Sequence, residues 1–190
     1  MPAFRTLIFD LGQTLIPFSL GPLQARLDGC REPALAMFRR FEAGALTSET
    51  FQSGLCRLTG LTAAEFAPWW NSIFEPRWLI EPGRLRGLMR RYRTGLLSNT
   101  NPLHYAFLVE QQPLLTEFAF HVLSHEVGAS KPDARIYQAA ETAAGCAPGE
   151  ILYFDDIPEF VATARRRGWQ AEVFTGAESV EQALAARAAA

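Results

Sequence analysis

Short apolar runs alternate with longer amphipathic stretches along much of the chain. The apolar runs predict buried strands at residues 4–10, 94–98, 119–124, 150–154 and 170–174. The amphipathic stretches predict helices at about 83–91, 102–110, 132–144, 157–167 and 178–188. This alternation is typical of a parallel sheet with helices on both faces. We therefore expect an α/β fold with three layers, of the Rossmann-like kind.

Two residues mark predicted helix ends. Pro132 suits the first turn of the 132–144 helix, where the missing backbone N–H leaves no hydrogen bond unmade. Gly168 follows three arginines and predicts the end of the 157–167 helix, because glycine readily adopts the left-handed conformation there.

Residues 17–81 break the alternation. They contain no convincing strand and several amphipathic helical stretches, one of which begins with the capping pattern Thr62-Ala-Ala-Glu65. The segment joins the first strand to the rest of the sheet. We therefore expect an α/β core from residues 1–16 and 82–190, with a helical cap inserted at 17–81.

Composition narrows the classes of partner. The net charge is −2, so no basic field predicts binding to nucleic acid or to an anionic membrane. No apolar run approaches the roughly 20 residues that span a bilayer. The three cysteines are widely spaced and fit neither a disulfide framework nor a zinc site, which favours a reducing cytoplasm.

Polar residues lie where the predicted strands end. Asp10, Ser98 with Asn99, and Asp155 with Asp156 each follow an apolar run, and Lys131 follows the third run after a short loop. Lys131 is the only lysine among 18 basic residues, so a role that arginine cannot fill is favoured. Ligands bind at the carboxyl ends of strands in open parallel sheets. Phosphoryl transfer requires a nucleophile, carboxylates that bind a hard cation, and hydrogen-bond donors for the anionic oxygens.

Four segments together resemble the motifs of the haloacid dehalogenase-like hydrolases. They are FDLGQTL at 9–15, LLSNTN at 96–101, SKPDARIY at 130–137 and YFDD at 153–156, in the family order. The resemblance covers the whole chain, with residues 17–81 in the place of the family's helical cap. The block from Leu96 to Asp156 is especially similar to bacterial phosphatases that act on α-D-glucose 1-phosphate.

The resemblance implies a Mg²⁺-dependent phosphatase acting on a small phosphate ester, and it implies a role for each matching residue. Asp10 would attack phosphorus and form an aspartyl-phosphate, and Thr14 would orient Asp10 by a hydrogen bond. Ser98 and the Asn99 backbone would hold the phosphate, and Lys131 would neutralise its charge. The metal ligands would be Asp10, the Gly12 carbonyl and Asp156, with Asp155 in support.

The chain departs from the family pattern at two positions. Gly12 stands where related phosphatases carry a second aspartate, which protonates the leaving oxygen. General acid–base help of this kind contributes about 10²–10⁴-fold to rate. Its absence favours esters with good leaving groups, such as sugar 1-phosphates. Phe160 stands where relatives often carry an asparagine near the lysine.

Two alternatives remain at the level of sequence. A 2-haloacid dehalogenase also lacks the second aspartate, but it needs no metal and gives little reason for Asp155 and Asp156. A non-catalytic phosphate-binding protein would explain Gly12 and Phe160, but it would not need the remaining set of catalytic residues. We expect a cytoplasmic enzyme with a small phosphorylated substrate, no nucleic acid partner and no membrane association.

Overall fold

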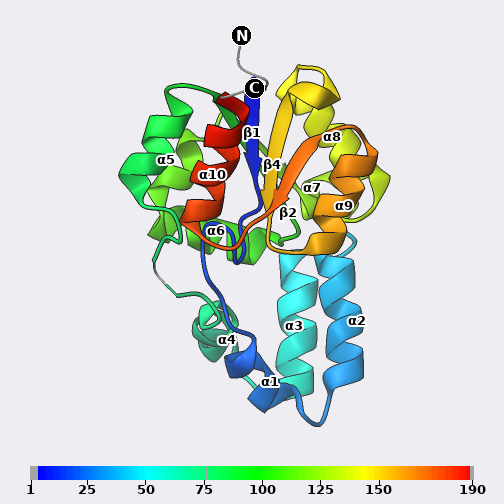
Figure 1. The fold of residues 1–190 in the computed structure, drawn as a ribbon. Helices are drawn as coiled ribbons and strands as arrows, with labels where there is room; N and C mark the ends of the chain where they lie inside the picture. The colour runs from blue at the N-terminus through cyan, green and yellow to red at the C-terminus, as the bar shows by residue number, and fades with distance from the viewer. Residues whose placement is uncertain (1–3, 76, 189–190) are drawn as a thin grey trace.

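One parallel sheet forms the centre of the molecule. A computed structural model describes residues 4–75 and 77–188, and its five strands have the order β3-β2-β1-β4-β5 (Figure 1). The strands are β1 (Thr6–Phe9), β2 (Arg93–Ser98), β3 (Phe120–Leu123), β4 (Ile151–Asp155) and β5 (Gln170–Val173). Each agrees with a predicted run to within two residues at either end. The predicted α/β fold is confirmed.

Helices cover both faces of this sheet (Figure 1). One face carries α5 (Pro82–Met89), α6 (Pro102–Gln111), the 3₁₀ helix η1 (Pro113–Glu117) and α10 (Ala177–Ala188). The other face carries α7 (Ser124–Val127), α8 (Ala134–Ala144) and α9 (Pro158–Arg166), and the short 3₁₀ helix η2 (Pro148–Glu150) precedes β4. The two apolar layers are separate because successive strand residues point to opposite faces. Leu7 and Phe9 of β1 belong to one layer and Ile8 to the other.

The register of the sheet brings the ends of β1 and β4 together. Phe9 pairs with Phe154, and the Asp10 amide donates to the Phe154 carbonyl at 2.9 Å. Asp10 therefore begins the loop after β1 at the same level as Asp155, the last residue of β4. Parallel pairing thus places two carboxylates from distant parts of the sequence at one edge of the sheet.

Four helices form a second layer beyond the carboxyl ends of the strands (Figure 1). They are α1 (Gly21–Leu27), α2 (Arg31–Glu42), α3 (Ser48–Thr59) and α4 (Ala63–Asn71). Their buried apolar side chains form a cluster of their own. The Thr62 capping box opens α4 as the sequence predicts, with Thr62 Oγ1 accepting from Glu65 N and Glu65 Oε2 accepting from Thr62 N. The predicted boundaries at 16/17 and 81/82 stay a prediction.

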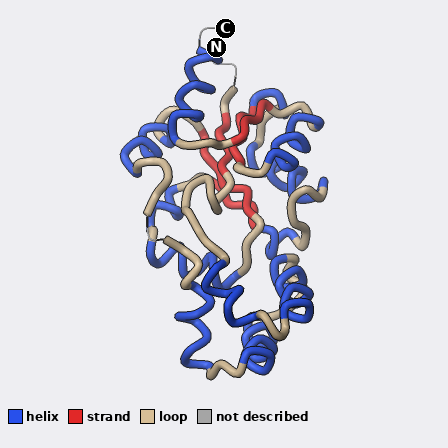
Figure 2. The backbone as a smooth tube through the Cα atoms, turned by 60° about the horizontal axis from the view of Figure 1, so that its bottom comes forward, coloured by secondary structure: helices blue, strands red, loops and turns tan. Residues whose placement is uncertain are grey.

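Two antiparallel segments connect the helical layer to the core. Ser19 N donates to Ile73 O at 2.8 Å, and Leu79 N donates to Leu15 O at 2.8 Å. Loops run from the sheet at the centre toward the helices of this layer (Figure 2). The two connecting segments are hydrogen-bonded to each other. The helical layer is therefore joined to the core by a pair of segments that restrain each other.

The start of α8 differs from the prediction. The helix begins at Ala134 with Asp133 as its N-cap, whose carboxylate accepts from Arg135 N at 2.9 Å. Pro132 therefore precedes the helix instead of lying in its first turn. The reason is that the backbone of Lys131, just before it, is held by hydrogen bonds to Asn99.

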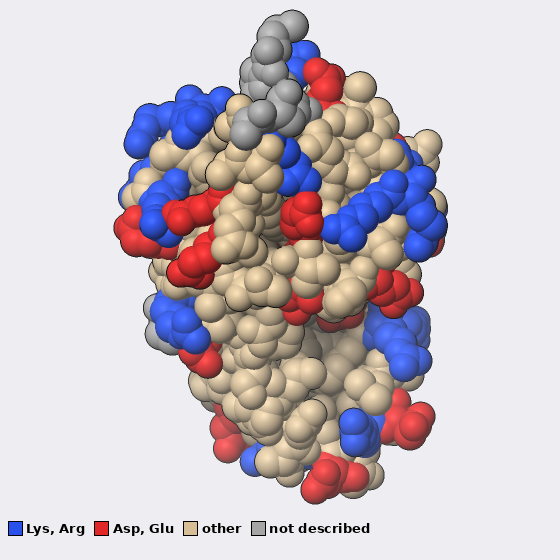
Figure 3. Space-filling view, viewed as in Figure 1, with Lys and Arg blue, Asp and Glu red and all other residues tan. Residues whose placement is uncertain are grey.

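Basic and acidic side chains are interspersed over the face seen in Figure 3. Within the residues that the structure describes, no helix combines the length and the apolar character that a membrane crossing requires.

Candidate active site

Lys131 is the centre of a buried polar cluster at the carboxyl ends of the strands. Its ammonium lies 2.8 Å from Asp10 Oδ1 and 2.6 Å from Asp155 Oδ2. Leu97 O and Tyr153 Oη lie 3.0 and 3.1 Å away. The Lys131 side chain is only 1% exposed. Three ammonium protons are thus shared among four oxygens from β1, β2 and β4, so the lysine holds three strand ends together.

Both carboxylate oxygens of Asp155 accept hydrogen bonds that hold the side chain in place. Oδ2 accepts from Lys131 and from the Tyr153 hydroxyl, and Oδ1 accepts from Ile157 N at 2.8 Å. Its side chain is fully buried. Sequence analysis missed Tyr153, although the signal was present: two residues apart on a strand, Tyr153 and Asp155 point to the same face.

Three carboxylates could hold a metal ion. Asp10, Asp155 and Asp156 each offer an oxygen, and these oxygens all lie within 4.8 Å of one another. Together with the Lys131 ammonium they carry a net formal charge of −2, which one divalent cation would balance. Carboxylate oxygens are the ligands that Mg²⁺ prefers. The Gly12 carbonyl stays a predicted ligand.

Burial disfavours the charged forms of Asp10 and Lys131, because it removes them from water. It raises the pKa of Asp10 well above the ordinary range, while the Lys131 ammonium lowers it and Asp155 raises it. Burial also lowers the pKa of Lys131, but its two carboxylate partners reverse this and leave the pKa raised. Lys131 therefore stays charged, and the Asp10 carboxylate lacks full compensation. A second cation beside Asp10 would supply it.

The Asn99 side chain holds the loop that carries Lys131. Asn99 Oδ1 accepts from Lys131 N at 2.7 Å, and Asn99 Nδ2 donates to Lys131 O at 3.0 Å. Because the side chain is used in this way, only the backbone of Asn99 remains for the predicted contact with phosphate. Ser98 ends β2 next to it and lines the cavity described below.

The predicted hydrogen bond between Thr14 and Asp10 was wrong. Thr14 Oγ1 is buried and has no hydrogen-bond partner among the described residues. The turn after β1 is closed by the backbone instead, since Leu15 N and Ile16 N both donate to Leu11 O at 2.9 Å. Asp10 is oriented by Lys131 rather than by this hydroxyl.

Aromatic rings occupy the space around both departures from the family pattern. A Cβ atom at Gly12 would lie 2.7 Å from Phe18 Cε1, so the Phe18 ring lies where a side chain at position 12 would begin. The Phe160 ring centroid lies 5.1 Å from Lys131 Nζ, a cation–π contact. A ring therefore contacts the lysine from the position where relatives often have an asparagine.

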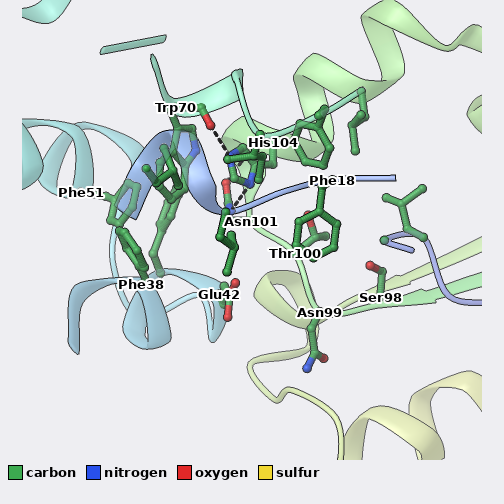
Figure 4. Close-up of a pocket in the computed structure, with 18 residues that line it drawn as sticks. Phe18, Phe38, Glu42, Phe51, Trp70, Ser98, Asn99, Thr100, Asn101 and His104 are labelled. Atoms are coloured by element: carbon green, nitrogen blue, oxygen red, sulfur yellow. Dashed lines mark hydrogen bonds between the residues drawn. The ribbon is translucent and has the colours of Figure 1, made fainter. Parts of the chain in front are cut away.

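A cavity of about 130 Å³ lies between the strand ends and the helical layer (Figure 4). Leu11, Gly12, Ser98 and Asn99 line it from the core. Phe38, Glu42, Phe51 and Trp70 are among the residues that line it from the helical layer. No lysine or arginine lines it within the described ranges, so the cavity is mainly apolar and aromatic next to the charged cluster.

His104 at this cavity is a structural link and not a free base. Its ring stacks on Trp70, with centroids 4.2 Å apart. Asn101 Oδ1 accepts from His104 N, so the Asn101 amide nitrogen faces Nδ1 at 3.1 Å and donates to it. Nε2 then carries the proton and donates to Trp70 O at 3.0 Å. This hydrogen-bond network assigns a neutral ring that joins α6 to the end of α4.

Acidification should weaken this link. Burial lowers the pKa of His104 to about 4 from 6.5. Between these pH values the unfolded chain binds a proton that the folded protein does not, so the free energy of unfolding falls as the pH falls through this window. We expect His104 to account for a loss of about 2 kcal/mol between about pH 7 and about pH 5. Urea unfolding of wild type and His104→Gln would measure it, since the variant should have the shallower pH dependence. Parallel pH curves for the two proteins would contradict the assignment.

Comparisons with known proteins find hydrolases and phosphatases. A family model described as haloacid dehalogenase-like hydrolase matches residues 83–168. D-ribitol-5-phosphate phosphatase of Bacteroides thetaiotaomicron is 26% identical over 186 residues, which cover 87% of this chain and 89% of the relative. A phosphatase of Mycobacterium tuberculosis is 38% identical over 98 residues, 51% of this chain and 43% of that protein.

The fold has a close counterpart among solved structures. A wild-type haloacid dehalogenase family enzyme from Bacteroides thetaiotaomicron, solved with magnesium and inorganic phosphate, has a TM-score of 0.76. It is 23% identical, and the alignment covers 90% of this chain and 93% of that one. At this identity the likeness concerns the fold. The family match over residues 83–168 and the two sequence relatives identify the chain as similar to the haloacid dehalogenase-like hydrolases.

Proposed function

We propose that this protein is a Mg²⁺-dependent phosphatase that hydrolyses a small phosphate ester through an aspartyl-phosphate on Asp10. One observation carries the proposal: a single buried ammonium bonds the Asp10 and Asp155 carboxylates, and Asp156 lies close enough to complete a cation site with them. The named phosphatases among the relatives support the same reaction class.

We assign one residue as the nucleophile and the others to binding and neutralising the phosphoryl group. Asp10 presents a carboxylate oxygen toward phosphorus, and Lys131 orients it and offsets negative charge on the phosphoryl group. Ser98 and the Asn99 backbone, at the end of β2, hold the phosphoryl oxygens. Asp10, Asp155 and Asp156 would hold Mg²⁺, which neutralises charge on those oxygens when bound. The cavity beyond receives the alcohol part of the ester.

We infer that the substrate is a sugar or polyol phosphate. A relative acts on D-ribitol 5-phosphate, and position 12 has no carboxylate, so protonation of a poor leaving group would need a donor from outside the turn after β1. A sugar 1-phosphate loses a more acidic hydroxyl than a primary alkyl phosphate does, so it depends less on such a proton. The three cysteines have no disulfide partner, and the proposal places the reaction in the cytoplasm.

The carboxylate cluster favours this function over the two alternatives. A dehalogenase does not require a cation site made by Asp155 and Asp156. Chloride release from 2-chloropropionate without Mg²⁺ would identify a dehalogenase. A phosphate-binding protein without activity has no need of a nucleophile held 2.8 Å from a buried lysine.

A screen of sugar phosphates and p-nitrophenyl phosphate, with and without Mg²⁺, tests the proposal. We expect phosphate release that falls at least about 10²-fold when EDTA removes the metal, because the cation offsets several kcal/mol of charge. Readdition of Mg²⁺ should restore it. Among sugars, kcat/KM should be higher for glucose 1-phosphate than for glucose 6-phosphate. Metal-independent turnover would count against the cation site, and the reverse order of sugars against the substrate class.

A further inference from the structure

Among the described residues of the core, no ionisable side chain near Asp10 is left free to protonate the leaving oxygen. Position 12 is a glycine, and the Phe18 ring lies 2.7 Å from where its Cβ would be. Lys131 bonds to both Asp10 and Asp155, and Asp156 could form a cation site with these two carboxylates. A side-chain proton donor would therefore have to come from the other side of the cavity.

Among the described residues that line the cavity, the side chains able to exchange a proton near neutral pH are Glu42 and His104. Both ring nitrogens of His104 are used in hydrogen bonds to Asn101 and Trp70. Glu42 has no hydrogen-bond or ion-pair partner within the part of the chain that the structure describes. It is partly buried, and burial raises its pKa. A carboxyl group in such surroundings holds its proton to higher pH.

Glu42 is the last residue of α2, at the end of that helix nearest the core (Figure 1). Figure 4 draws it on the cavity wall with Ser98 and Asn99 from the core side. Two residues later, Gly44 has φ +68°, and a Cβ there would clash with the carbonyl oxygen of His125. Only glycine permits this close packing of the helical layer on α7.

The contact continues to the loop that holds phosphate. His125 Nδ1 lies 3.2 Å from Thr100 O, and Ser124 Oγ bonds to both the N and the O of Thr100. Thr100 lies two residues after Ser98. A short chain of contacts therefore fixes the end of α2 relative to the phosphate loop, and it holds Glu42 at the cavity.

We propose that Glu42 is the general acid and base of this site, in place of the aspartate that position 12 lacks. The inference rests on the proposed phosphatase function. In the first step Asp10 bonds to phosphorus, the ester P–O bond breaks, and the leaving oxygen keeps the electron pair and takes the proton of Glu42. In the second step water attacks phosphorus and gives a proton to Glu42, and the bond to Asp10 breaks, which restores both carboxyl groups.

A series of substrates with different leaving groups tests this role. p-Nitrophenolate leaves without a proton, whereas the alkoxide of a primary alkyl phosphate requires one. We expect Glu42→Gln to lower kcat/KM for alkyl phosphates by about 10²–10⁴-fold and to change kcat/KM for p-nitrophenyl phosphate less than about tenfold, because kcat/KM reports the steps up to departure of the leaving group. Loss of the base in the second step should lower kcat for all substrates alike. The plot of log kcat/KM against leaving-group pKa should become steeper. Glu32→Gln, on the exposed first turn of the same helix, is the matched control and should match wild type on every substrate.

The outcomes separate this proposal from others. A uniform loss of kcat/KM on all substrates, or a rise in KM with unchanged kcat, would assign Glu42 to packing or to substrate recognition and would overturn the inference. Retained turnover of p-nitrophenyl phosphate shows that the variant is folded. If wild type hydrolyses no phosphate ester, the proposed function itself fails. If wild type is active and the leaving-group dependence of Glu42→Gln is unchanged, only the role of Glu42 fails.

Discussion

An Asp10→Asn variant should hydrolyse p-nitrophenyl phosphate about 10⁵-fold more slowly than wild type, the scale of loss when a nucleophile is removed. The amide keeps the shape of the carboxylate but is a poor nucleophile toward phosphorus. Lys131 keeps its bond to Asp155, so the rest of the site stays in place. The measurement is phosphate release under saturating Mg²⁺. Activity within tenfold of wild type would show that Asp10 is not the nucleophile.

The same variant should be no less stable than wild type. Burial raises the pKa of Asp10, which means that the folded state disfavours its ionised form relative to the unfolded chain. The ionised carboxylate therefore costs stability above its unfolded pKa of 3.8. Asparagine removes that cost, and we expect a gain of about 1 kcal/mol near neutral pH in metal-free protein, as is common when an active-site charge is removed. Urea unfolding measures this gain and also shows that the loss of activity is not a loss of fold.

The main residues of the site could be predicted because parallel strands end at one edge of a sheet. Asp10, Ser98 and Asp155 each follow an apolar run, and the strand order then brings Asp10 and Asp155 onto one lysine. The sheet itself was predictable for the same reason, since its strands are continuous apolar segments. The length and position of the apolar runs are enough to predict the strands and the residues at their ends. The paths of the loops are not needed for this.

The loops and the helical layer were less predictable. Whether Thr14 reaches Asp10, and which partner the Asn99 side chain selects, depend on turn geometry that the pattern of residue types does not encode. Glu42 belongs to an amphipathic helix whose pattern indicates a buried face but not what that face covers. The close contact between Gly44 and His125 links two segments 81 positions apart in sequence, and only the folded chain reveals it.

Replacing Lys131 by methionine should lower both activity and stability. Without the ammonium, Asp10 and Asp155 face each other in a buried site with no counter-charge. Removing one partner of a buried ion pair costs about 3–5 kcal/mol, and we expect this loss in the free energy of unfolding of metal-free protein. Turnover should fall about 10³-fold or more, because the charge on the phosphoryl group also loses its partner.

An exposed ion pair provides the matched control for this effect. Arg135 and Asp133 are 2.8 Å apart, the same distance as Lys131 and Asp10, but their side chains are 66% and 39% exposed. Arg135→Met should therefore cost less than about 1 kcal/mol and leave turnover unchanged. Equal losses of stability for the two methionine variants would mean that burial does not strengthen the Lys131 cluster.

Lys131→Arg separates charge from shape. Arginine is the basic residue at 17 of the 18 basic positions in this chain, so the lysine is not explained by a general need for positive charge. A guanidinium is planar and spreads its charge over three nitrogens, whereas one ammonium here meets four oxygens at 2.6–3.1 Å from three strand ends. The larger group does not fit a side-chain site that is 1% exposed without displacing Asp155 or Tyr153. We expect Lys131→Arg to lose about 10²-fold or more in kcat despite its charge. Near wild-type turnover in this variant would show that the positive charge alone, and not the compact shape of the ammonium, is what the site requires.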